Sequence, residues 1–195
     1  MASMKMVGVN VASDPLYTVS YIGANGGLVL AAADDPGLYS SQNEQDSRCV
    51  ARVAQVPVLE PSDSQEAKDF TKLAFEYSER YDKRVMVRTT TRLAHSQGPV
   101  TLEERQEIPD KPYERSAAKH VMMPANAKGR HIHVENRLRQ MAEDACGFAI
   151  NKAIYKDTSV GFITSGIPYT YVAEAMPEAS VLKLGLVHPL PRKLI

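Results

Sequence analysis

A polar segment from residue 34 to residue 48 carries most of the side chains that could bind a ligand. It begins with Asp34 and Asp35 and ends at Arg48, whose planar fork of donors matches a carboxylate group. The alternative is that Arg48 pairs with Glu44 or Asp46 and only braces the segment, and the sequence leaves both open. We expect this segment to face a substrate through Ser40, Ser41, Gln42, Asn43, Glu44 and Arg48.

A second polar segment lies at the end of a predicted strand over residues 84–89. Its arginine and hydroxyl side chains could meet another domain or a partner subunit. The alternative is an interface or a satisfied cluster in the core, because threonine hydroxyls often bond to nearby backbone. The secondary candidates are Arg88, Thr89, Thr90, Arg92 and His95.

Residue types that hold metals occur here without the spacing of a metal site. His131 and His133 are two residues apart, whereas zinc pairs on a helix are roughly three to five apart. Cys49 and Cys146 are the only cysteines, and an iron–sulfur cluster is normally held by about four thiolates. We therefore expect no metal site. One disulfide is formally possible, but we expect two free, buried thiols, as is usual in a reducing cytoplasm.

Apolar runs predict the elements that would position these side chains. Residues 28–33 form a predicted buried strand that ends directly before Asp34, and open α/β sheets bind ligands outside the carboxyl ends of their strands. An amphipathic helix follows a capping box of Ser62 and Gln65. We expect an α/β fold with an open, mainly parallel sheet and flanking helices, built from strands 28–33, 56–59 and 84–89 and helices 10–21, 45–54 and 63–82.

The chain changes character after residue 97. Residues 98–130 contain four prolines and alternating charges, which favours a connector laid over the surface. A helix from Val134 to Gly147, a strand over 159–164, a helix capped by Ser165 and a strand over 180–186 then begin a second α/β layer. We therefore divide the chain into residues 1–97, a connector of residues 98–130, and residues 131–195.

Composition narrows the class of protein. The 195 residues carry a formal net charge of zero and 44% hydrophobic residues, enough for one domain or slightly more. Neutral charge gives no electrostatic argument for nucleic acid or an anionic membrane, and no apolar run approaches the length of a membrane span. The first residues lack the features of a signal peptide, so we expect a cytoplasmic protein. Incomplete layers expose apolar faces, so we also expect an oligomer.

Long, ordered motifs connect these segments to a known family. They lie at residues 34–48, 58–67, 87–96, 120–127, 161–167 and 181–186, the first reading Asp-Asp-Pro-Gly and then Ser-Ser-Gln-Asn-Glu-Gln-Asp-Ser-Arg. With these motifs the chain resembles the large (alpha) subunit of indolepyruvate ferredoxin oxidoreductase from Met4 to Ile195. The resemblance implies the later part of a pyrimidine-side, thiamine-diphosphate-binding-like domain, followed by the start of a transketolase C-terminal-like domain.

The resemblance also implies a reaction, the oxidative decarboxylation of indolepyruvate or similar aryl pyruvates to an acyl-CoA. The implied cofactors are thiamine diphosphate with Mg and 4Fe–4S clusters, held mainly outside this chain, so we expect none bound tightly here and no metal on Asp34 and Asp35. The implied partners are the rest of the alpha subunit, a small (beta) subunit, ferredoxin and CoA. The alternative is a non-catalytic assembly fragment or split subunit, and we expect the isolated chain to be inactive.

One stretch departs from the family pattern. Residues 5–10 (Lys-Met-Val-Gly-Val-Asn) align with a stretch that usually reads Lys-His-Val-Gly-Leu-Asn. By this resemblance Lys5 or Asn10 could donate to the substrate carboxylate or to the pyrimidine ring, whereas Met6 cannot take a proton-transfer role of the usual histidine. The alternative is a solvated lysine and a helix-capping asparagine.

Overall fold

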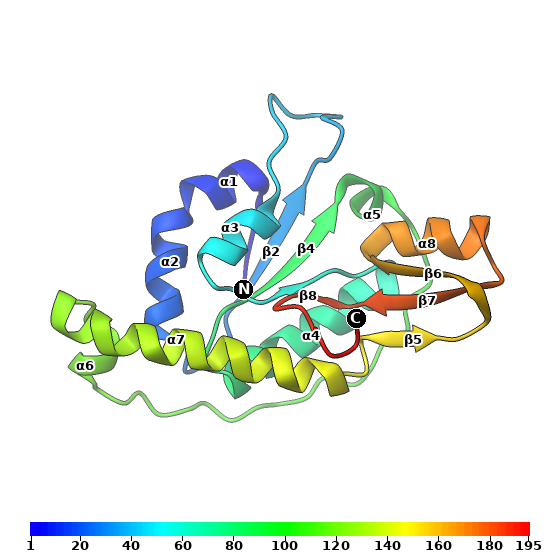
Figure 1. Ribbon diagram of the computed structural model, residues 1–195. Coiled ribbons are helices and arrows are strands. Elements are labelled where there is room, and N and C mark those ends of the chain that lie inside the picture. Colours follow the sequence, from blue (N-terminus) through cyan, green and yellow to red (C-terminus); the bar gives the residue numbers. More distant parts are fainter.

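Two sheets form the framework of the computed structural model, which describes residues 1–195 (Figure 1). The larger sheet has the strand order β1-β2-β4-β3-β8, and the smaller has the order β5-β7-β6. The strands are β1 (Ala2–Lys5), β2 (Val29–Asp34), β3 (Val58–Leu59), β4 (Val85–Thr90), β5 (Lys152–Ile154), β6 (Asp157–Ser165), β7 (Ala179–Leu184) and β8 (Leu186–His188).

Most neighbouring strands run parallel. β2 pairs in parallel with β1 and β4, β3 pairs in parallel with β4, and β6 pairs in parallel with β7, whereas β5 and β8 are antiparallel to their partners. This confirms the predicted α/β fold with mainly parallel sheets. The helices are α1 (Met6–Val11), α2 (Ser13–Ile22), α3 (Ser47–Val53), α4 (Ser64–Arg80), α5 (Thr91–His95), α6 (Ala117–His120), α7 (Pro124–Asp144) and α8 (Gly166–Ala175).

Both faces of the larger sheet are covered, because alternate residues of a strand point to opposite sides. On one face, Val29 of β2 and Val85 of β4 belong to a buried cluster with Phe70 of α4. On the other face, Leu30 and Met86 belong to a second cluster with residues of α1, α2 and α3. Each such buried side chain contributes about 1.5–3 kcal/mol through removal of apolar surface from water. The two clusters hold the carboxyl ends of β2, β3 and β4 in one fixed edge.

Helix α4 begins one residue later than the predicted capping box. Its N-cap is Asp63, whose Oδ1 accepts a hydrogen bond from the backbone N–H of Glu66 at 2.8 Å. Glu66 Oε2 accepts in turn from the backbone N–H and the hydroxyl of Ser62 at 3.0 and 2.9 Å. Gln65 lies on the outer face and donates to Asp69. The cap therefore uses the carboxylates of Asp63 and Glu66, with Ser62 as the donor to Glu66, because a carboxylate is a stronger acceptor than the amide of Gln65.

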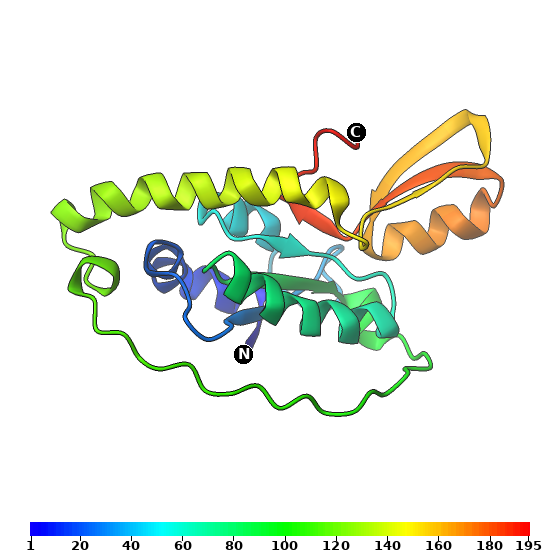
Figure 2. The same cartoon turned by 90° about the horizontal axis from the view of Figure 1, so that it is seen from below.

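Helix α7 begins inside the segment that the sequence assigns to a connector. The extended run is residues 98–116, which Figure 2 shows passing along the outside of the molecule. An ion pair of Lys72 with Glu103 at 2.9 Å helps to hold it against α4. The predicted helix starts only at Val134, because Gly129 and polar neighbours interrupt the apolar period before it. The predicted boundary at residue 130 thus falls within α7, and the division into domains stays a prediction.

Three short strands and one interruption of a predicted helix were not predicted. β1, β5 and β8 have three or four residues each, too few to give a recognisable alternation. β8 returns to the larger sheet and pairs antiparallel with β3, so residues 186–188 lie outside the second layer expected there. The predicted helix over residues 10–21 is two helices, α1 and α2, divided at Ala12.

The smaller sheet and α8 lie beside one end of the larger sheet (Figure 1). Lys183 of β7 is buried and donates to Ser62 Oγ at 2.7 Å and to Glu66 Oε1 at 2.5 Å. Its ammonium group also lies 4.3 Å from the ring centre of Tyr169 on α8. Although burial opposes ionisation of Glu66, the hydrogen bonds from Lys183 and Ser62 lower the pKa of its carboxyl group. This contact ties the smaller sheet to α4.

No helix combines the length and the apolar character that crossing a membrane requires.

Candidate functional site

A buried arginine organises the carboxyl-end edge of the larger sheet. Arg88, near the end of β4, donates from Nε to Asp34 Oδ2 at 2.6 Å and from Nη1 to Glu60 Oε1 at 2.8 Å. Asp34 is the last residue of β2, and Glu60 directly follows β3. All three side chains are buried, so each charge depends on its partners for compensation. Three neighbouring strand ends are therefore joined through one guanidinium group.

The same network continues to the helices on either side. Asp34 accepts from the backbone N–H of Ser47 at 2.9 Å and from its hydroxyl at 2.5 Å, which fixes the start of α3. Glu60 Oε2 accepts from Ser165 Oγ at 2.6 Å. Ser165 occupies the N-cap position of α8 as predicted, but its hydroxyl does not cap the helix because Glu60 takes it. The edge of the sheet and the start of α8 thus form one polar surface.

Asp35 gathers the loop that follows β2. Its carboxylate accepts from the backbone N–H of Ser40 at 2.8 Å, the hydroxyl of Ser41 at 2.5 Å and the hydroxyl of Thr91 at 2.8 Å. These hydrogen bonds, that of Ser41 first, lower the pKa of Asp35 to about 2. Lys5 Nζ donates to the carbonyl of Ser40 at 2.8 Å. The first part of the loop is therefore held in place by the sheet edge rather than left free in solvent.

Arg48 already has a carboxylate partner within the chain. Its Nε and Nη2 donate to Asp46 at 2.9 and 2.7 Å, and its Nη1 lies 3.6 Å from Glu60 Oε1. The hydrogen bond to Asp46 raises the pKa of the guanidinium group. This is the pairing with Asp46 that the sequence offered as an alternative, while a role in holding substrate stays a prediction.

Two adjoining hollows open on this polar surface. The charged hollow has a volume of about 280 Å³, and among its lining residues are Arg48, Arg88 and Glu60. The aromatic hollow has a volume of about 720 Å³, and Tyr39 lines it on the side of the loop. Three residues line both hollows: Arg92 of α5 and Ile167 and Tyr171 of α8.

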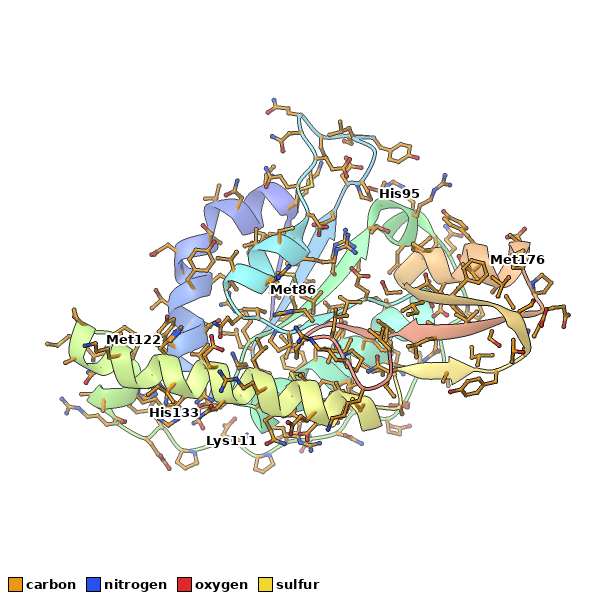
Figure 3. The ribbon with its side chains drawn as sticks, viewed as in Figure 1. Met86, His95, Lys111, Met122, His133 and Met176 are labelled. Atoms are coloured by element: carbon orange, nitrogen blue, oxygen red, sulfur yellow. The ribbon has the colours of Figure 1, made fainter.

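The structure brings some of the predicted site residues together and separates others. Arg48, Arg88, Thr90 and Arg92 line the charged hollow. Ser40, Arg92 and His95 line the aromatic hollow, and Figure 3 shows His95 on α5 at this end of the sheet. The predicted residues that line neither hollow are Lys5, Asn10, Ser41, Gln42, Asn43, Glu44 and Thr89.

The predicted site residues outside both hollows make only local contacts or no side-chain hydrogen bonds. Asn10 is exposed inside α1 and is not a helix cap. Asn43 accepts from Gln45, and Glu44 accepts from the backbone N–H of Gly37 at 3.1 Å. Thr89 donates to the carbonyl of Ala32 at 3.5 Å, a contact within the sheet. The second half of the loop therefore braces itself and does not reach the hollows.

Sequence reasoning missed Glu60, Ser165, Tyr39 and the residues of α8. One signal was available for Glu60, since it follows a buried strand as Asp34 does. Its partner could not be inferred, because Ser165 lies 105 residues away and belongs to the other sheet. Tyr171 gives no sequence signal, since an exposed tyrosine on a helix needs no special explanation.

The donor set of this chain does not fit the cofactor groups that the resemblance implies. No group of three or more His, Cys, Asp or Glu side chains converges as a metal site. The carboxylates of Asp34 and Asp35 are occupied by the hydrogen bonds described above. Cys49 and Cys146 are free thiols as expected, but neither is buried, since Cys49 is exposed and Cys146 half-buried. Two thiols are too few for a cluster that takes about four. His131 on α7 accepts from or donates to the Tyr21 hydroxyl at 2.9 Å, away from the sheet edge.

Comparison with known proteins gives relatives along the whole chain. The chain is 42% identical over 204 residues to the indolepyruvate oxidoreductase subunit IorA of Archaeoglobus fulgidus and 43% identical over 207 residues to that of Pyrococcus abyssi. Each match covers 100% of this chain and 32% of the relative. The chain thus spans about a third of the length of these relatives. No protein-family model matches it.

A solved structure shares the fold. The 2-oxoglutarate:ferredoxin oxidoreductase from Magnetococcus marinus, determined with 2-oxoglutarate, coenzyme A and succinyl-CoA bound, superposes with a TM-score of 0.64. The match covers 97% of this chain and 42% of that chain at 16% sequence identity. This likeness supports the α/β fold with two sheets. The curated relatives confirm the family resemblance that the sequence motifs indicate.

Proposed function

The chain is related along its full length to the indolepyruvate oxidoreductase subunits IorA, and we propose that it forms the pyrimidine-side part of a thiamine-dependent 2-oxoacid:ferredoxin oxidoreductase. The proposed substrates are indolepyruvate and similar aryl pyruvates, converted to acyl-CoA. The observation that carries the proposal is the overall identity of 40–43% with subunits of that name, in matches that cover 98–100% of the chain. The arrangement at the sheet edge supports it, because polar side chains gather where open sheets bind ligands.

In this proposal the chain supplies the substrate side of the site. Arginines around the charged hollow attract the carboxylate of the substrate, and Asp35 keeps the loop of Ser40 and Ser41 closed over the sheet edge. Thiamine diphosphate with Mg, when bound by the remaining segments, supplies the chemistry of decarboxylation. Iron–sulfur clusters, if held by those segments, would supply the one-electron chemistry that reduction of ferredoxin needs, and the small (beta) subunit and CoA would complete the assembly. An exposed free Cys49 suits a cytoplasmic location.

A second candidate is a non-catalytic assembly fragment or split subunit. The observation in its favour is that this chain has neither a metal-binding group nor the thiolates for a cluster. Such a fragment would stabilise the complex without facing substrate, and its polar sheet edge would be an interface with the missing segments.

Complementation separates the two candidates. The remaining segments of an IorA subunit, the small subunit and the cofactors are mixed with or without this chain, and indolepyruvate-dependent reduction of ferredoxin is measured. Reduction that requires both indolepyruvate and this chain is expected. A complex that assembles with the chain but reduces ferredoxin no faster than the mixture without it would assign the chain to assembly instead.

A further inference from the structure

Among the arginines of the two hollows, Arg92 is the one without a partner. Arg48 is held by Asp46, and Arg88 is held by Asp34 and Glu60. Arg92 makes no hydrogen bond or ion pair, and its side chain is exposed. An anion that approached Arg48 or Arg88 would have to displace a carboxylate that already satisfies the guanidinium group. The free cation of the surface is therefore Arg92.

Arg92 stands where the two hollows meet. It is the second residue of α5, two residues after the end of β4, and lines both the charged and the aromatic hollow. A bound anion would neutralise Arg92, which is the only unpaired positive charge among the residues that line the two hollows. A bidentate contact to a carboxylate is the geometry that a free guanidinium group favours.

The larger hollow has the lining that a planar aromatic group requires. Tyr39 from the loop is 67% exposed and Tyr171 from α8 is 52% exposed, and both line it together with Ile167. Exposed aromatic rings beside an apolar depression offer stacking surface to a flat ligand. The volume of about 720 Å³ lies within the range of small-molecule sites and exceeds the needs of a short aliphatic side chain.

Resting on the function proposed above, we propose that Arg92 and Tyr171 are the specificity-determining residues for an aryl pyruvate. The carboxylate binds Arg92 at the junction, and the aromatic ring lies in the aromatic hollow against Tyr39 and Tyr171. Arg48 and Arg88 shape the charged hollow but keep their own carboxylate partners. The adenine nucleotide end of CoA also combines a flat ring with an anion. The test therefore distinguishes an aryl pyruvate from CoA as the ligand of the hollows.

The test uses binding, which does not depend on cofactor or turnover. The chain contains no tryptophan, so indole fluorescence comes only from the ligand. Indole-3-lactate, a hydroxy analogue that cannot be decarboxylated as a 2-oxoacid, is titrated with the wild-type chain. Arg92→Ala and Tyr171→Ala are each expected to weaken its binding about tenfold, and Arg92→Lys to recover part of the loss. Lactate, which lacks the ring, is expected to compete poorly.

Matched controls are available on the same chain. Arg115→Ala removes another exposed arginine without a partner, and Tyr155→Ala removes another exposed tyrosine. Both are expected to bind indole-3-lactate as the wild type does. Equal binding by Arg92→Ala and the wild type would overturn the proposal, as would absence of saturable binding to the wild type. Displacement of bound indole-3-lactate by adenosine 3′,5′-bisphosphate with an inhibition constant below the dissociation constant of indole-3-lactate would assign the hollows to CoA.

The outcome is independent of the complementation assay. A complex that oxidises indolepyruvate equally well with Arg92→Ala and with Arg115→Ala would overturn this inference and leave the proposed function standing. Binding of indole-3-lactate that depends on Arg92, in a chain whose complex does not oxidise indolepyruvate, would support the binding site and contradict the proposed function.

Discussion

The hydroxyl of Ser165 donates to Glu60 Oε2 at 2.6 Å, joining residues 105 positions apart in the chain. Glu60 follows a strand of the larger sheet, and Ser165 ends a strand of the smaller one. The other oxygen of Glu60 receives the guanidinium group of Arg88. A single carboxylate therefore fixes α8 against the sheet edge and holds the arginine that joins the strand ends, so the shape of both hollows depends on it.

Glu60→Gln is expected to destabilise the fold. The substitution keeps the size of the side chain but removes one of the two charges that compensate Arg88, and hydrogen bonds to charged groups contribute about 1.5–3 kcal/mol. We expect the free energy of unfolding in urea to fall by about 2 kcal/mol. Glu104→Gln, which changes an exposed carboxylate that has no hydrogen bond or ion pair, is the control. Equal stability of the two variants would show that the Glu60 network is not a structural element.

Because Lys83 is buried, we expect the free energy of unfolding to rise at alkaline pH. Burial, with a smaller contribution from Arg137, lowers the pKa of Lys83 from 10.5 to about 7, and its one hydrogen bond goes to the carbonyl of Gln55. Because the unfolded chain binds the proton more tightly, stability should increase as the pH rises from about 7 to about 10.5. Lys83→Met should remove most of this increase.

The measurement for Lys83 is the melting temperature across that pH range. Lys128→Met, which removes an exposed lysine without contacts, should keep the slope of the wild type. A Lys83→Met variant with an unchanged slope would mean that the ammonium group is solvated in the folded chain. The nearby His188 does not interfere, since burial and then Lys83 lower its pKa to about 4.

Arg48 is expected to contribute to substrate use in the reconstituted enzyme. Arg48→Ala should lower the specificity constant for indolepyruvate about 10- to 100-fold, the scale of one charge-assisted interaction, because it removes a positive charge from the lining of the charged hollow beside Arg92. Arg48→Lys should recover only part, because an ammonium group cannot reproduce the fork. Arg52→Ala, one turn further along α3, is the control.

The decisive comparison for Arg48 is with stability. The pair with Asp46 means that Arg48→Ala could act by loosening the loop. A lower melting temperature with an unchanged specificity constant would make Arg48 a brace. In that case Arg92 would remain the cation that meets the substrate.

The sequence predicts the elements that have a long apolar period and misses contacts between distant segments. Strands β2 and β4 and helix α4 were predicted within a few residues, since each has a clear period and a polar end. Arg48 was predicted as a site residue because it ends the polar segment that follows the strand over residues 28–33, and Arg88 because it lies near the end of the strand over residues 84–89. Glu60 and Tyr171 were not, because their significance comes from packing the second sheet against the first.

Self-association is expected through exposed apolar side chains on neighbouring helices. Val11 on α1 is 87% exposed and Val53 on α3 is 71% exposed, and the two helices contact each other. We expect a dimer or larger assembly by light scattering at micromolar concentration, since such surface is usually buried in an interface. Val11→Asp combined with Val53→Asp should shift the mass toward a monomer. A wild-type chain that stays monomeric throughout would contradict the prediction.

The division of work between this chain and the rest of the enzyme is tested most directly by calorimetry. Thiamine diphosphate with Mg is titrated into the chain alone, into the remaining segments alone and into their mixture. We predict no measurable binding to the chain alone, because its carboxylates at the sheet edge are already paired, and binding to the mixture. Binding to the chain alone in the micromolar range would contradict the account and place the diphosphate site within these residues.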